Sequence, residues 1–148
     1  SDIRRSYTVM GDAVNLASRI EALTRIYGID IVLGQTTQEA IGERLPLVEV
    51  DRVRVKGKQQ AVTLFTPVAQ AHANDSRFAE EVRLWNLALA HYRRQDAKQA
   101  LTSLAALRDG FGGSALGGLY GQLGERIERW SLQPEPPDWD GTRTFDSK

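Results

Sequence analysis

The stretch YTVMGDAVNLASRIE, residues 7–21, joins two different periodicities and determines how the first part of the chain is interpreted. Residues 6–10 are β-prone, and Gly11 and Asp12 then form a stop for a strand and a cap for a helix. Beyond Asp12, apolar residues recur at helical spacing as far as Gly28, a typical C-terminal stop. The stretch therefore predicts a strand followed by a helix.

The residues after Gly28 alternate between further strand and helix signals. Residues 29–33 predict a strand, and Thr36 with Glu39 three residues later predicts a capping box that opens a short helix to about Arg44. These signals continue the alternation that the first stretch begins.

Residues 48–65 carry the pattern of a hairpin. Apolar residues at 48 and 50 give way to apolar residues at 53 and 55, and this change of phase predicts a bulge or a turn around Asp51 and Arg52. Residues 57–60 would turn the strand back into residues 62–65. The order strand, helix, strand, helix, strand, strand predicts an α+β fold with an antiparallel hairpin.

The second part of the chain is helical. Residues 69–75 predict a linker, Gln95 and Asp96 a turn, and three apolar stripes predict helices near residues 78–92, 97–107 and 116–130. Pro134, Pro136 and Pro137 end the third helix, so Trp139 lies in a tail that is extended or docked.

Composition excludes several classes of protein. The 148 residues contain 19 basic and 19 acidic side chains, which argues against an electrostatic nucleic-acid binder. No apolar run is long enough to span a membrane, and there is no cysteine for a disulfide or thiolate metal site. His72 and His91 are too isolated to suggest a histidine-ligated metal. We expect a globular protein without nucleic-acid or membrane contacts from this segment.

Asn15 and Arg19 are the first candidate site residues, because they lie four residues apart and project from one face of the predicted helix. An arginine there could hold a phosphate through two parallel hydrogen bonds, and an asparagine could orient a sugar hydroxyl. The alternative is a solvated arginine beside a capping asparagine. For Asp12 we favour a helix cap over a catalytic role.

The whole of residues 7–21 closely resembles the second-half signature of the class III nucleotidyl cyclases, the adenylate and guanylate cyclases. Residues 52–58, RVRVKGK, resemble their later signature at about the expected distance. The resemblance extends from residue 1 to about residue 68. It implies half of a ferredoxin-like cyclase domain, an antiparallel sheet with helices, over residues 1–70.

The resemblance also implies roles for single residues. Asn15 corresponds to the residue that positions the ribose, and Arg19 to the one that stabilises charge on the reacting α-phosphate. Thr8 stands where the family reads the purine, which favours adenylate over guanylate. Lys56, with Lys58 as its neighbouring candidate, corresponds to the lysine that contacts the terminal phosphates.

The family's metal ligands are not expected in this sequence. Class III cyclases use two aspartates of their first half to bind two divalent ions, Mg²⁺ or Mn²⁺. Ser1-Asp2-Ile3-Arg4 imitates that motif superficially, but residues 7–21 follow too soon, so we do not assign Asp2 as a ligand. The expectation is a chain that binds nucleotide weakly and is inactive alone, with a site completed by a second half through homodimerisation or self-association.

The helical tail carries weaker resemblances. Residues 71–131 resemble a tetratricopeptide-like helix pair plus a third helix, with an ordinary helical hairpin or three-helix tail as the alternative. Residues 132–148 form a proline-rich C-terminus whose segment PPDWDG, residues 136–141, resembles the tail of some bacterial cyclase proteins.

Two functions from different classes follow. The first is part of an adenylate cyclase that converts ATP to cyclic AMP and pyrophosphate in signal transduction. The second is a non-catalytic regulatory module that uses the cyclase-like half and the helical tail to bind nucleotide or protein. Intact Asn15, Arg19 and Lys56 favour the enzyme. ATP as substrate implies a cytoplasmic location, with any membrane anchor outside this segment.

Overall fold

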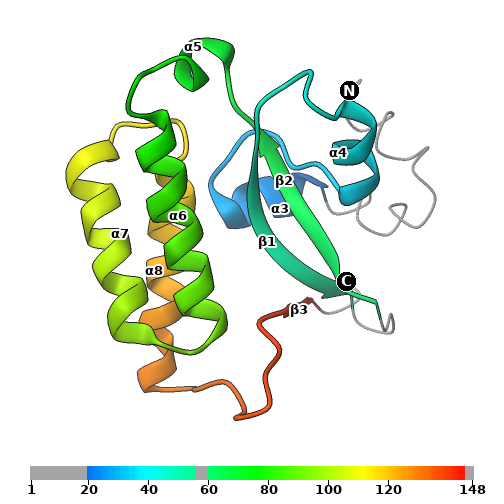
Figure 1. The fold of residues 1–148 in the computed structure, drawn as a ribbon. Helices are drawn as coiled ribbons and strands as arrows, with labels where there is room; N and C mark the ends of the chain where they lie inside the picture. The colour runs from blue at the N-terminus through cyan, green and yellow to red at the C-terminus, as the bar shows by residue number, and fades with distance from the viewer. Residues whose placement is uncertain (1–19, 56–59, 146–148) are drawn as a thin grey trace. The chain divides into compact units, whose positions relative to one another are not determined.

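The computed structural model describes residues 20–55 and 60–145, which pack into two compact units (Figure 1). The first unit holds the described residues up to Ala73 together with those after Gly141, and the second runs from Asn74 to Gly141. Helices accompany a three-stranded sheet, so the predicted α+β class is confirmed.

Helix α3 (Ile20–Tyr27) ends where the sequence predicts. Gly28 adopts a φ of 66°, and the N–H of Ile29 donates to the carbonyl of Thr24 at 3.1 Å. This bond from the second residue after the helix to its last turn is a Schellman motif, which favours glycine at the left-handed position. The predicted strand at residues 6–10 and the start of the predicted helix lie outside the described residues.

The predicted strand over residues 29–33 is wrong. Leu33 alone forms a bridge, exchanging hydrogen bonds with Phe65 at 2.7 and 2.8 Å. The buried side chains of Ile29 and Val32 are three residues apart and therefore do not alternate as in a strand. A helix begins two residues after Leu33, which leaves no length for a longer ladder.

Helix α4 (Gln35–Ile41) forms without the predicted capping box. Its N-cap is Gly34, which has no side chain to accept a bond, and Glu39 instead accepts a hydrogen bond from the Gln35 amide at 3.3 Å. The helix stops at Gly42, whose φ is 59°, before the predicted end at Arg44.

Strands β1 (Leu47–Val55) and β2 (Val62–Pro67) form the predicted antiparallel hairpin. The register shifts between Glu49 and Asp51, so the predicted bulge is confirmed and Val50 is the extra residue. Because of the bulge, two consecutive side chains, Val50 and Asp51, are each only 1% exposed.

A third strand, β3 (Arg143–Phe145), was not predicted from the sequence. It pairs parallel with the end of β1, Arg143 opposite Val53 and Phe145 opposite Val55, which gives the sheet order β2-β1-β3. The apolar core of this unit comes from α3, the loop after it and the hairpin: Leu23, Tyr27, Ile29, Val32, Val48, Val50, Val53, Leu64 and Val68.

Before the second unit, α5 (Gln70–Ala73) forms one short turn of helix inside the predicted linker. The unit itself contains α6 (Phe78–Arg93), α7 (Ala97–Phe111) and α8 (Gly117–Glu128), followed by the 3₁₀ turn η2 (Arg129–Ser131). The three predicted helices are thus confirmed, and successive helices run antiparallel (Figure 1).

The apolar stripes of the three helices meet as the core of the second unit. Its largest buried pair is Trp85 and Tyr120, whose ring centroids lie 5.5 Å apart. The other buried apolar residues are Ala88, Leu89, Tyr92, Ala100, Leu104, Leu107, Leu116, Leu119, Leu123 and Ile127. The tetratricopeptide-like character of α6 and α7 stays a prediction.

Candidate functional site

The five predicted site residues all lie outside the described residues. Thr8, Asn15 and Arg19 precede residue 20, and Lys56 and Lys58 fall in the interval 56–59. The structure therefore describes the elements that flank these residues in the chain.

Two of those elements continue directly into the candidate residues. Helix α3 begins at Ile20, the residue after Arg19, and β1 ends at Val55, the residue before Lys56. Strand β2 begins at Val62, and Val53 pairs with Val62 across the hairpin. The two lysines thus belong to the connection between two paired strands.

A buried polar junction joins α3 to β1. The Tyr27 hydroxyl, at the last residue of α3, donates to Oδ2 of Asp51 at 2.7 Å. The other carboxylate oxygen, Oδ1, accepts from the backbone N–H of Arg52 at 2.8 Å. Tyr27 is 0% and Asp51 1% exposed, so the carboxylate is surrounded by the core and satisfied by these donors.

The C-terminal strand reaches the same junction. The guanidinium of Arg143, on β3, lies 5.7 Å from the centroid of the Tyr27 ring and 4.7 Å from that of Phe145. Both contacts are of the cation–π kind. Residues from α3, β1 and β3 therefore meet around Tyr27.

The second unit has a comparable buried bond. The Tyr120 hydroxyl donates to Oε2 of Glu81 at 2.5 Å, and each residue is 1% exposed. Burial, and then the hydrogen bond to Glu81, raise the pKa of the Tyr120 phenol far above its ordinary value of 10.0. The phenol therefore stays a donor to Glu81 throughout the physiological pH range.

The PPDWDG segment docks within the second unit. Trp139 packs edge-on against Tyr92 and Trp130, with centroids 5.1 and 5.9 Å apart, and Tyr92 stacks on Trp130 at 5.4 Å. Arg126 covers the Tyr92 ring at 4.9 Å and donates to its hydroxyl. The motif singled out in the sequence thus has a packing role, with its Trp139 against α6 and the 3₁₀ turn η2.

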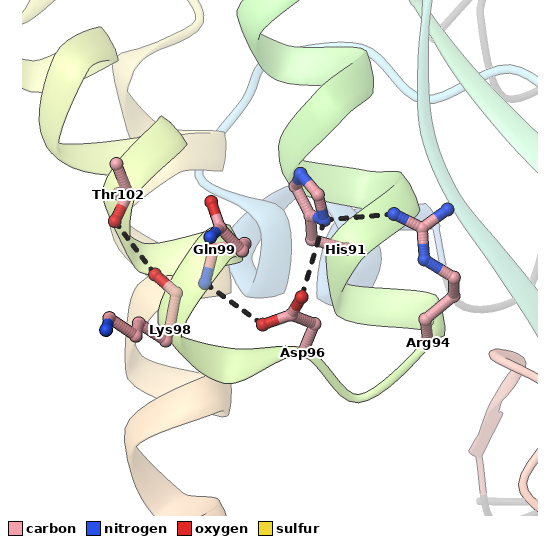
Figure 2. A network of polar contacts seen from close by, with 6 residues as sticks. All are labelled: His91, Arg94, Asp96, Lys98, Gln99 and Thr102. Carbon is pink, nitrogen blue, oxygen red and sulfur yellow. Dashed lines mark hydrogen bonds and ion pairs between the residues drawn. The ribbon is translucent and has the colours of Figure 1, made fainter.

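The turn between α6 and α7 holds a small polar network (Figure 2). Asp96 caps α7, because its Oδ1 accepts from the Gln99 N–H at 3.2 Å. The ring Nδ1 of His91 lies 3.0 Å from the Arg94 guanidinium and 3.9 Å from Oδ2 of Asp96. Gln95, at a φ of 61°, sends its amide to the carbonyl of Pro136 at 3.0 Å. The network fixes the turn and ties it to the proline-rich segment.

The described residues do not supply a metal site. In residues 20–55 and 60–145, no three His, Asp or Glu side chains gather in a way that could hold a metal ion. The Mg²⁺ or Mn²⁺ implied by the resemblance therefore finds no fitting donor set among these residues. None of the helices in these same ranges combines the length and apolar character needed to cross a membrane.

Sequence reasoning missed the two buried tyrosine–carboxylate bonds. The burial of Asp51 is explained by the predicted bulge, which turns consecutive side chains to the core. Its hydrogen-bond partner Tyr27, however, is 24 residues away in the sequence. Glu81 lies on the first turn of α6, and its partner Tyr120 is 39 residues away.

The chain is similar to adenylate cyclases over about 40% of its length, which confirms that part of the resemblance. No family model matches the chain, and no solved structure does.

Two curated relatives carry this similarity. The terminal-differentiation-specific adenylate cyclase of Dictyostelium discoideum is 46% identical over 65 residues, 42% of this chain and 3% of that protein. An adenylate cyclase of Anabaena cylindrica is 43% identical over 61 residues, 39% of this chain and 12% of that protein. The matched segment thus spans a small part of either relative's length.

Proposed function

We propose that this chain contributes the nucleotide-positioning residues of a class III adenylate cyclase, which converts ATP to cyclic AMP and pyrophosphate. The observation that carries the proposal is the 46% and 43% identity to two adenylate cyclases. The two cyclase-like motifs, residues 7–21 and 52–58, support it.

In the proposed reaction, the ribose 3′-oxygen forms a new bond to the α-phosphorus. The bond from the α-phosphorus to the oxygen that bridges it to the β-phosphate breaks, pyrophosphate leaves with that electron pair, and the hydroxyl proton is released. Such phosphoryl transfer depends on positioning and on stabilising charge that develops in the transition state.

Each candidate residue has a part in that chemistry. Asn15 aligns the ribose so that the hydroxyl faces the α-phosphate, and Arg19 stabilises the charge that develops there. Lys56, with Lys58 beside it, compensates charge on the leaving pyrophosphate, and Thr8 contacts the purine. The β1–β2 hairpin supports this arrangement, because it brackets the two lysines with paired strands.

The complete site is proposed to be shared. A complementary cyclase half, in a homodimer or another partner, would supply the acidic residues that hold Mg²⁺ or Mn²⁺. The 148-residue chain alone is therefore expected to make no measurable cyclic AMP. Its substrate, ATP, places the proposed site in the cytoplasm.

The experiment measures cyclic AMP from ATP and Mn²⁺, first with the chain alone and then with a fragment that supplies a cyclase first half. Cyclic AMP formed in the mixture and not by either component supports the shared site. A folded chain that stays inactive in the mixture contradicts the proposal and favours a non-catalytic regulatory module. Cyclic AMP formed by the pure chain contradicts the division of the site.

A further inference from the structure

The Tyr27–Asp51 bond links the two elements that continue into the proposed site. Tyr27 is the last residue of α3, and Asp51 lies at the bulge of β1. From Tyr27 to Ile20 the helix rises roughly 10 Å at 1.5 Å per residue. From Asp51 to Val55 the strand advances roughly 13 Å at 3.3 Å per residue. In the sequence, Arg19 directly precedes the first of these elements and Lys56 directly follows the second.

The Tyr27–Asp51 hydrogen bond requires a carboxylate to be buried in the core, which costs free energy. Burying a carboxylate removes its hydration, and this is tolerated only when donors replace the lost water. Asp51 has such donors, the Tyr27 hydroxyl at 2.7 Å and the Arg52 N–H at 2.8 Å, one on each oxygen. An apolar pair of similar size could fill the same space, so the polar bond adds direction: it fixes the end of α3 at one point along β1.

We infer that Tyr27 and Asp51 are positioning residues for the proposed cyclase reaction. Their hydrogen bond holds α3 in one register against β1. We expect it to act through Arg19 and Lys56, which in the sequence directly precede α3 and directly follow β1. This inference rests on the proposed function, because the two residues act through Arg19 and Lys56 and do not touch the nucleotide.

The alternative is a bond that only stabilises the fold, and the chain offers a matched control for it. Tyr120 and Glu81 form the same kind of buried bond in the helical unit, at 2.5 Å and with both residues 1% exposed. Tyr27→Phe and Tyr120→Phe each remove one buried phenolic hydroxyl from a carboxylate. They differ in whether the affected elements lead into the proposed site.

The test measures cyclic AMP production by each variant in the complemented mixture, that is, the chain together with the fragment that supplies a cyclase first half. The temperature is one at which circular dichroism shows both variants folded. Misplacing a positioned group by about 1 Å costs up to roughly 100-fold in rate. We expect Tyr27→Phe to lower kcat about 10- to 100-fold, and Tyr120→Phe to leave it within twofold of the unmodified chain. Asp51→Asn, which keeps the shape of the side chain, provides a second variant if Tyr27→Phe does not fold.

A second readout separates positioning from stability. Residues that act as one unit give non-additive effects. Tyr27→Phe should therefore cost much less in an Arg19→Ala background than alone, whereas a loss of fold stability would reduce both backgrounds equally. An unchanged kcat for folded Tyr27→Phe, or fully additive effects, would overturn the inference.

Amide hydrogen exchange tests the coupling of α3 to β1 without depending on cyclase activity. Tyr27→Phe should speed exchange of the β1 amides at least tenfold, and Tyr120→Phe should not. An inactive mixture with the unmodified chain would refute the proposed function and the catalytic consequence together. The exchange data would then decide by themselves whether the bond couples α3 to β1, and unchanged exchange would overturn that coupling too.

Discussion

Gly141 is the glycine whose replacement should disturb the docked C-terminal segment most. Its φ is 83°, a conformation that residues with a Cβ rarely adopt. A Cβ built there would lie 2.8 Å from Cγ and 2.9 Å from Cβ of Arg93, near the end of α6. These are the first atoms of the arginine stem, which cannot move aside without the helix backbone. Gly141→Ala should therefore displace the segment that carries Trp139.

The size of the effect can be estimated from these two causes. A left-handed backbone costs a residue with a Cβ about 1–2 kcal/mol, and forcing an atom into a filled space costs about 1–3 kcal/mol. The lower entropy of the unfolded chain returns roughly 0.4–1 kcal/mol. The expected loss in the free energy of unfolding is about 2–4 kcal/mol.

The assay is urea unfolding followed by tryptophan fluorescence, which reports on Trp139, on Trp130 beside it and on Trp85 in the core of the same unit. The control is Gly121→Ala in α8, where nothing lies within 4 Å of the built Cβ, and the φ is not one that disfavours side chains. This control should stabilise the helix by up to about 1 kcal/mol. Equal stability of Gly141→Ala and the unmodified chain would show that position 141 accepts a Cβ without strain or displacement of Arg93.

Two further predictions concern the helical unit. The pKa of Tyr120 is raised above 10.0, mainly by burial and then by its bond to Glu81, so above pH 10 the unfolded chain loses this proton while the folded chain keeps it. The free energy of unfolding should therefore fall as pH rises beyond 10, and Tyr120→Phe should flatten this slope in chemical denaturation; an identical slope in the variant would contradict the assignment. Asp96→Ala removes the cap of α7 and should cost about 1 kcal/mol, or roughly 4–8 °C in Tm for a unit of this size. Exposed Asp109, near the other end of α7, is the control, and an equal Tm loss from Asp109→Ala would contradict a capping role for Asp96.

Local patterns in the sequence were sufficient for most of the elements. The three helices of the second unit follow from apolar spacing, because each buries one stripe against the others. The bulge in β1 follows from the change of phase between Val50 and Val53, since a shift of one residue would otherwise turn the apolar side chains to the wrong face. Gly28 ends α3 because its φ of 66° is a left-handed conformation that glycine adopts without steric cost.

Features that depend on distant partners could not be predicted in this way. Strand β3 has three residues, too few for a periodic pattern, and exists because the end of β1 offers a free edge. The predicted capping box at Thr36 does not form, because the N-cap of α4 is Gly34, two residues earlier in the sequence. The side-chain hydrogen bonds of Asp51 and Glu81 join residues 24 and 39 positions apart, and the local sequence does not indicate which tyrosine is the partner.

The candidate site rests on motif resemblance and on similarity to two adenylate cyclases. Resemblance assigns roles to Thr8, Asn15, Arg19, Lys56 and Lys58, and the structure describes the elements that adjoin them in the chain.

The most direct measurement compares cyclic AMP production by Arg19→Ala and Arg25→Ala in the complemented mixture at saturating ATP. Arg25 is an exposed arginine in the last turn of α3, so it controls for loss of a positive charge close by in the chain. We predict a loss of the order of 10³-fold or more for Arg19→Ala, as for removal of a transition-state arginine, and no more than a twofold change for Arg25→Ala. Equal activity of the two variants would contradict the assignment of Arg19 to the reacting phosphate.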